Sequence, residues 1–93
     1  MSESQGPISV YDVAAIMAEQ MASIAWQKLG LHPDPMTNTI AADLIEAKVA
    51  IDIVTYLSEQ MESKLDEEDR RELHNLVRNL RLNFVEKSRS LPS

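Results

Sequence analysis

An uninterrupted apolar-rich segment constrains the fold of this chain more than any other feature. From residue 40 to 65 the sequence reads IAADLIEAKVAIDIVTYLSEQMESKL and contains neither Gly nor Pro. It predicts one helix of about 26 residues, roughly 39 Å long. Advancing about 100° per residue around that helix places two apolar stripes on it. The first stripe consists of Ile40, Leu44, Ala47, Ile51, Val54, Met61 and Leu65, and the second of Ile45, Val49, Ile53, Tyr56 and Leu57.

The polar seam between the two stripes is narrow, so most of this helix should be covered. Its members are Lys48, Asp52, Thr55 and Glu59. Two neighbouring helices can bury one stripe, and the second stripe therefore predicts a surface for a partner.

Two further helices are expected on either side of this segment. The first should begin at Ser9, whose hydroxyl can cap the helix, and run to about Leu29 before Gly30 ends it. The last should begin with Asp66 as its cap and run to about Lys87. The buried face predicted for the first helix is Val10, Val13, Ala14, Met17, Met21, Ile24 and Ala25, and that for the last is Leu73, Leu76, Val77, Leu80 and Phe84.

The totals agree with an all-α domain. The chain has 93 residues, of which 44% are hydrophobic and only two are Gly. We expect a three-helix bundle with a long central helix, in which the second and third helices form an antiparallel hairpin. The domain should span residues 9–87, between a disordered lead-in at 1–8 and a flexible tail at 88–93.

Charge and residue content exclude several classes of protein. A net charge of -6 disfavours nonspecific binding of nucleic acid or of a membrane surface. The chain has no cysteine, so it carries neither disulfides nor thiolate chemistry. The N-terminal residues do not resemble a signal peptide, and no segment is apolar enough to span a membrane, so we expect a cytoplasmic protein.

The connection from residue 30 to 39, GLHPDPMTNT, is stiffened by two prolines. Asn38 or Thr39 should cap the following helix. His32 and Asp34 could suggest a metal site, but two ligands without further His or Cys nearby are a weak signal. A turn in which Asp34 accepts backbone hydrogen bonds is the preferred interpretation, and it makes a structural loop of Gly30, Pro33, Asp34 and Pro35.

This loop and the helices around it resemble the DUF1844 family of small bacterial proteins. The resemblance covers roughly residues 10 to 87, and its most specific element is the Leu-Gly-Leu-x-Pro-Asp-Pro loop. It implies a small helical cytosolic protein with no established activity. The other matching elements are Thr37, Ala47-Lys48, Ile51-Asp52, Leu80-Arg81-Leu82 and Phe84-Val85-Glu86. The chain departs from the family pattern at two places, the first of which is a Gly-Asn pair expected between the second and third helices. Ser63-Lys64 stands in place of that pair, and Asn83 in place of a basic residue.

Trp26 lies away from the predicted buried face of the first helix. Ala15, Ala18 and Ala22 lie near it and would let another helix approach closely. Three interpretations stay open for Trp26: the second helix or the loop folds over it, it is buried in a homo-oligomer, or it binds a foreign partner.

A row of basic residues recurs at three- and four-residue spacing on the last predicted helix. A one-sided arginine row can bind RNA phosphates or an acidic protein surface. It can equally be a solvated face, paired with acidic residues such as Glu67, Glu68, Asp52 or Glu59. The row consists of Arg71, His74, Arg78 and Arg81, with Arg70 at its edge.

No residues form a catalytic, cofactor-binding or metal-binding motif, so an enzyme is not expected. The prediction is a non-enzymatic cytosolic interaction or adaptor protein, associating as a homodimer through the second stripe and the Trp26 side of the first helix. An unknown protein partner is also possible. The alternative is an RNA- or ribosome-associated protein that uses the basic row.

Overall fold

The computed structural model describes residues 7–90 and contains three α-helices and one 3₁₀ turn in that range, with no strand. The helices are α1 (Val10–Lys28), α2 (Leu44–Met61) and α3 (Glu67–Ser90), and the 3₁₀ turn is η1 (Glu62–Lys64). The predicted all-α class is therefore confirmed. Residues 1–6 and 91–93, which belong to the expected lead-in and tail, lie outside the described range. Helix α3 continues to Ser90, into the segment that was expected to be a tail.

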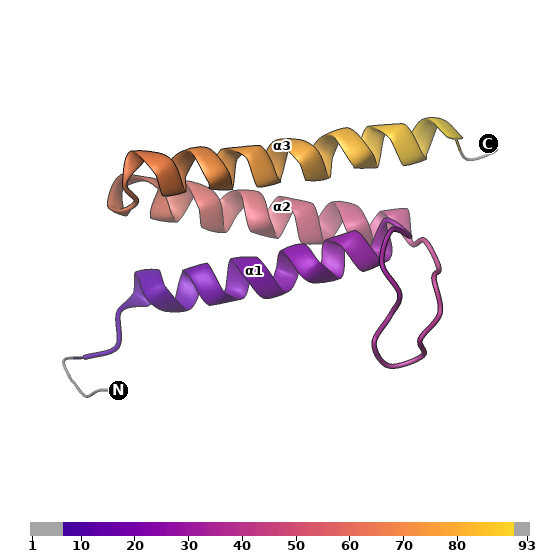
Figure 1. Ribbon diagram of the computed structural model, residues 1–93, viewed down its shortest axis with the longest axis horizontal. Helices are drawn as coiled ribbons and strands as arrows, with labels where there is room; N and C mark the ends of the chain where they lie inside the picture. The colour runs from indigo at the N-terminus through magenta and orange to yellow at the C-terminus, as the bar shows by residue number, and fades with distance from the viewer. Residues whose placement is uncertain (1–6, 91–93) are drawn as a thin grey trace.

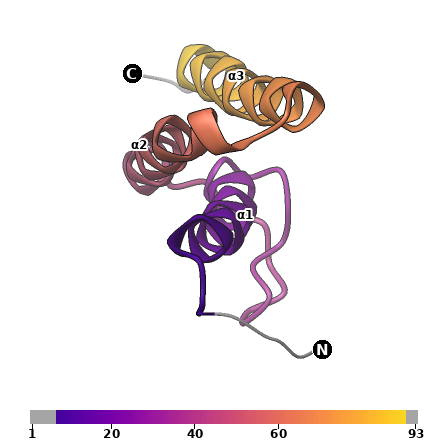
Figure 2. The ribbon, with the colours of Figure 1, turned by 90° about the vertical axis from the view of Figure 1, so that its left-hand side faces the viewer.

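The helices lie side by side with α2 in the middle (Figure 1). Helix α2 runs antiparallel to both neighbours, and η1 joins it to α3 in the expected hairpin (Figures 1 and 2). Helices α1 and α3 contact each other far less than each contacts α2. The molecule is consequently elongated and flat, about 51 × 29 × 18 Å.

The bounds of α2 differ from the prediction. Asp43 caps α2, accepting a hydrogen bond from the Glu46 amide at 3.1 Å, so the expected cap at Asn38 or Thr39 is wrong. The Asp43 amide also donates to the Lys28 carbonyl at 2.7 Å, which ties the start of α2 to the end of α1. Asn38 has a left-handed conformation with φ 56°, whereas a capping residue is typically extended, and the Thr39 hydroxyl lies 2.8 Å from that of Thr37.

The predicted single helix over residues 40–65 is therefore too long. Helix α2 has 18 residues, and α3, with 24, is the longest helix. After the C-terminal end of α2 the chain forms the 3₁₀ turn η1, where Arg70 donates hydrogen bonds to the carbonyls of Glu62 and Leu65. Two other predicted caps are confirmed: Ser9 accepts from the Tyr11 amide, and Asp66 accepts from the Asp69 amide.

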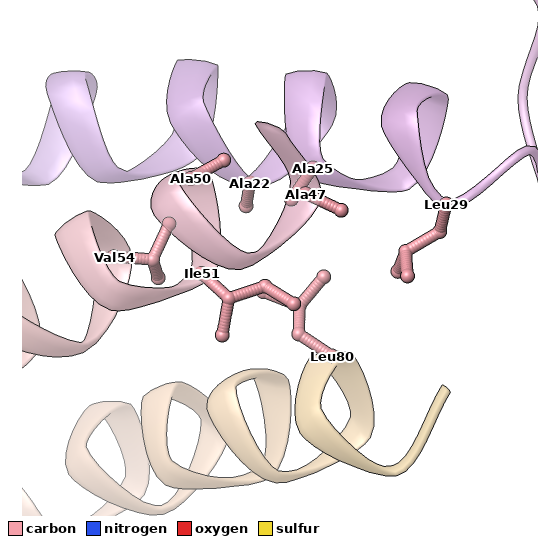
Figure 3. Close-up of a cluster of buried hydrophobic side chains, with 8 residues drawn as sticks. All are labelled: Ala22, Ala25, Leu29, Ala47, Ala50, Ile51, Val54 and Leu80. Carbon is pink, nitrogen blue, oxygen red and sulfur yellow. The ribbon is translucent and has the colours of Figure 1, made fainter. Parts of the chain in front are cut away.

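Helices α1 and α2 pack through alanines (Figure 3). Small side chains on both helices allow their backbones to approach closely, because little volume separates them. The face of α1 that this packing buries is Ala14, Ala18, Ala22, Ala25 and, just past the helix, Leu29.

The buried face predicted for α1 is therefore partly wrong. Val10, Val13, Met17 and Ile24 are 41–78% exposed, and only Ala14 and Ala25 of the predicted set are buried. The prediction places the largest side chains inward, whereas in the structure the smaller alanine side chains face α2. Of the first apolar stripe predicted for the central helix, Ala47, Ile51, Val54 and Met61 are buried, and Leu44 and Leu65 are half-buried. Ile40 lies before α2 and is 64% exposed, so its place in the stripe is wrong.

Helix α3 contributes one fully buried side chain to the core. Leu80 belongs to the same buried cluster as Ile51, Val54 and the alanines of α1 and α2 (Figure 3). The remaining members of its predicted stripe are half-buried around this core: Leu73, Leu76, Val77 and Phe84.

Candidate interaction surfaces

The second apolar stripe of α2 faces outward. Ile45 is 82% exposed, Tyr56 61%, Val49 55% and Ile53 37%. Leu57, the fifth predicted member, is half-buried and packs against the core cluster around Ala14, Ala18 and Met61. Four large apolar side chains are thus left on the outer side of α2. We call these four residues, Ile45, Val49, Ile53 and Tyr56, the α2 ridge.

A groove runs along each side of the α2 ridge, and Val49 lines both. Both grooves are mainly apolar, and each carries one ion pair. The groove between α1 and α2 is lined by Met21, Ile24, Lys28, Glu46, Val49, Ala50 and Ile53. The groove between α2 and α3 is lined by Leu44, Ile45, Lys48, Val49, Asp52 and Phe84.

The ion pairs in these grooves join neighbouring elements or successive turns. Lys28 on α1 lies 3.1 Å from Glu46 on α2, and the hydrogen bond to that carboxylate raises the pKa of Lys28. Lys48 and Asp52 form a 2.9 Å pair one turn apart on α2. Charged groups therefore sit at the margins of an otherwise apolar surface.

Trp26 is partly covered by its own chain. It is half-buried, packs against the main core, and its ring centroid lies 6.1 Å from that of His32. The Leu31 amide donates to the Trp26 carbonyl at 3.1 Å, which holds the loop against this end of α1. The exposed apolar residues of α1 lie elsewhere, at Val10, Tyr11, Val13, Ile16, Met17 and Ile24.

Two members of the basic row form ion pairs within the protein, and a third, His74, has its imidazole beside a carboxylate. Arg71 lies 3.6 Å from Glu67, and His74 lies 3.4 Å from Glu62. Arg81 donates to Asp52 at 3.2 Å and to the Thr55 hydroxyl at 2.9 Å.

Of the three arginines in the row, Arg78 alone makes no ion pair with any residue between 7 and 90. It lines a shallow groove between α2 and α3 together with His74, Glu59 and Glu62. The basic row is thus interleaved with carboxylates from α2 and from the first turn of α3.

The Pro-Asp-Pro loop is held together by its own hydrogen bonds. A carboxylate oxygen of Asp34 accepts from the amides of Met36 (2.7 Å) and Thr37 (3.3 Å), as the turn interpretation predicts. The Asp34 amide donates to the Thr39 carbonyl, and the Asn38 amide donates to the Asp34 carbonyl. Within the described part of the chain no three His, Asp or Glu side chains are grouped to hold a metal ion.

A fourth groove lies between α1 and α3, and it is not predicted as a site from the sequence. Its floor is apolar and its rim carries carboxylates from both helices. The lining residues are Ala15, Ala18, Glu19, Met61, Leu65, Asp69, Glu72, Leu73 and Leu76. Its signal in the sequence was the series Ala15, Ala18 and Ala22, which indicated room for another helix beside α1.

These features define a small all-helical protein whose distinctive surfaces are apolar grooves between helices. No helix among residues 7–90 is long and apolar enough to cross a membrane. The chain matches the model of the family described as a domain of unknown function, DUF1844, over residues 11–86, and it belongs to that family. Comparisons with curated proteins and with solved structures found no match.

Proposed function

We propose that this protein is a non-enzymatic cytoplasmic adaptor that forms a homodimer through the α2 ridge. The observation that carries the proposal is the exposure of Ile45, Val49, Ile53 and Tyr56 on the central helix. A contiguous apolar patch of this kind on a small protein is typical of an interface, because leaving it in water is unfavourable.

The grooves beside the α2 ridge support a self-complementary contact. In a two-fold dimer the same patch serves both copies, so a ridge on one copy must meet a groove on the other. The ridge at Val49 and the grooves on either side of it supply both shapes within one surface. Met21 and Ile24 extend this surface onto α1.

The mass of the protein in solution tests this proposal directly. Light scattering coupled to size exclusion should give about twice the 10.5 kDa of one chain, with little change between low and high salt, because apolar contacts are not screened. A mass of 10.5 kDa at every concentration would reject the homodimer.

A matched pair of variants locates the interface. Val49→Glu places a charge on the α2 ridge and should convert the dimer to a monomer. Ile16→Glu makes the same chemical change at an α1 side chain of equal exposure, 54% against 55%, that lines none of the grooves described above. Ile16→Glu should keep the dimer mass. If both variants lost the dimer mass equally, the dimer contact would not lie on the α2 ridge.

A second candidate function is association with RNA or the ribosome through the basic row. The exposed guanidinium of Arg78, without an ion pair among the described residues, favours it. Binding to phosphates should weaken steeply with salt and on Arg78→Glu. Lys64→Glu makes the same charge change at a residue outside the row and serves as the control. Unchanged RNA retention by Arg78→Glu would exclude this function.

A further inference from the structure

The groove between α1 and α3 combines an apolar floor with a purely acidic rim. Its volume is about 460 Å³. Leu73, Leu76 and Leu65 are half-buried along it, so each still presents part of its side chain to solvent. Glu19 borders the groove from α1, and Asp69 and Glu72 border it from α3.

The groove is open because α1 and α3 pack on α2 and hardly touch each other. On its α1 side the floor is made of Ala15 and Ala18, whose side chains are too short to reach across to α3. In Figure 2, α3 lies above α2 and α1 lies below it. Space therefore remains along the start of α3 for the side chains of another helix.

The charge of the rim is uncompensated. None of Glu19, Asp69 and Glu72 forms an ion pair with a residue in the described range, and no Lys or Arg of that range lines the groove. Carboxylates on both sides of an apolar trough favour a ligand that is apolar along its centre and positively charged along both flanks.

We propose that the α1/α3 groove binds a basic amphipathic helix of another protein. Apolar side chains of that helix, at positions i, i+3, i+4 and i+7, would pack on Leu73 and Leu76. Its Lys or Arg side chains would pair with Glu19 on one side and with Asp69 and Glu72 on the other.

The α2 ridge of a second copy of this chain fits the α1/α3 groove less well than a basic helix of another protein does. The lysines beside that ridge, Lys28 and Lys48, are already paired with Glu46 and Asp52, so the ridge offers no row of unpaired cations to the acidic rim. The proposed site also shares no residue with the grooves beside the α2 ridge. The inference is therefore independent of the proposed homodimer, and either can fail alone.

The direct test is binding of a designed probe peptide to the full chain. The probe is a fluorescein-labelled helix of about 18 residues, roughly 27 Å long, with Leu at i, i+3, i+4 and i+7 and Lys at the other positions. One control peptide has the same composition in a scrambled order, and another has Glu in place of Lys. Fluorescence anisotropy should show that the amphipathic basic peptide binds at least tenfold more tightly than either control, a difference of about 1.4 kcal/mol.

Charge-reversal variants locate the site of binding. Glu72→Lys changes the rim and should raise the Kd by about tenfold, because attraction becomes repulsion. Glu86→Lys makes the same change on the same helix at an exposed position outside the groove. It should change the Kd by less than about twofold, since a distant exposed charge is screened.

A floor variant tests the apolar part without changing charge. Ala15→Phe should fill the groove and weaken the probe, with circular dichroism confirming that the helices remain. In a ¹⁵N NMR titration of the wild type, the largest shifts should fall on Ala15, Ala18, Leu73 and Leu76.

Several outcomes would overturn the proposal. If Glu86→Lys and Glu72→Lys weakened peptide binding equally, the peptide would be attracted by net charge alone. Equal affinity for the scrambled peptide would mean that binding does not depend on the amphipathic pattern and hence not on the groove. Loss of binding on Val49→Glu, but not on Glu72→Lys, would place the peptide on the α2 ridge. A dimer mass that is lost on Glu72→Lys without any peptide would identify a second copy of this chain as the occupant.

Discussion

The guanidinium of Arg81 on α3 donates a hydrogen bond to the carboxylate of Asp52 on α2 across 3.2 Å. Lys48 donates to the other oxygen of that carboxylate at 2.9 Å. The hydrogen bond from Lys48, followed by that from Arg81, lowers the pKa of Asp52 below its ordinary value of 3.8. This is the main electrostatic link between the second and third helices.

The lowered pKa predicts how this link depends on pH. A carboxyl group whose pKa is lower in the folded than in the unfolded state stabilises the fold above its unfolded pKa of about 3.9. That contribution is lost as the pH falls through the lower, folded pKa, so the expected window lies below about pH 4. The effect should be small, because both side chains are 47% exposed.

The measurement is the free energy of unfolding in urea between pH 3 and 7, for wild type, Asp52→Asn and Glu59→Gln. Asp52→Asn should flatten the acid limb of the stability curve. Glu59→Gln removes the same charge at an exposed α2 residue that makes no ion pair within residues 7–90, and it should follow the wild type. Parallel curves for wild type and Asp52→Asn would contradict the assigned link.

Gly30 should not tolerate a side chain. Its φ is +81°, and a Cβ built on it would lie 3.3 Å from the Cβ of Ala42. Gly30→Ala combines left-handed strain with a close contact, and it should destabilise the fold by about 1–2 kcal/mol. Asn38→Gly is the matched control at the other left-handed position, φ 56°. It should be close to neutral, because Gly adopts that conformation without strain.

Leu80 should be the most sensitive residue of α3. It is fully buried and is the only residue of this helix in the buried class. Leu80→Ala should cost about 2–4 kcal/mol through lost transfer energy and a cavity. Leu82→Ala, at a 59% exposed side chain of the same helix, should stay within about 0.5 kcal/mol of wild type. Chemical denaturation of both variants provides the comparison, and similar losses would mean that Leu80 does not anchor α3.

Local signals predicted the helices well. Ser9 and Asp66 are the caps that the sequence indicates, and the apolar periodicity of α2 places Ile51 and Val54 in the core. These features depend on interactions within a few residues or on one helix face, so the sequence alone contains them. On α3 the helical periodicity likewise places Leu80 on the buried face and the basic row on a different face.

Packing between helices could not be read in the same way. On α1 the alanine stripe, not the stripe of large side chains, faces α2, because closeness of backbones decides this contact. The start of α2 depends on the tether from the Asp43 amide to the Lys28 carbonyl, which joins residues distant in sequence. The α1/α3 groove depends on how far those helices diverge, so only its alanines were visible in the sequence.

Arg70, in the first turn of α3, holds the hairpin turn that follows α2, although the sequence places it at the edge of the basic row. Its guanidinium donates to the Leu65 carbonyl at 2.9 Å and to the Glu62 carbonyl at 3.3 Å. These carbonyls lie where the hairpin turns, and helix-end carbonyls need such donors. Arg70→Ala should therefore destabilise the fold by about 1–2 kcal/mol.

Two variants separate this capping role from charge. Arg70→Lys keeps the charge but should recover only part of the loss, since one ammonium group does not reproduce the fork of donors. Arg71→Ala removes the neighbouring charge, whose pair with Glu67 is exposed and 3.6 Å long, and it should cost less than about 0.5 kcal/mol. Urea denaturation ranks the three variants. Equal stability of Arg70→Ala and Arg71→Ala would show that the hairpin turn closes without the guanidinium of Arg70, whereas the expected order assigns that guanidinium to the turn.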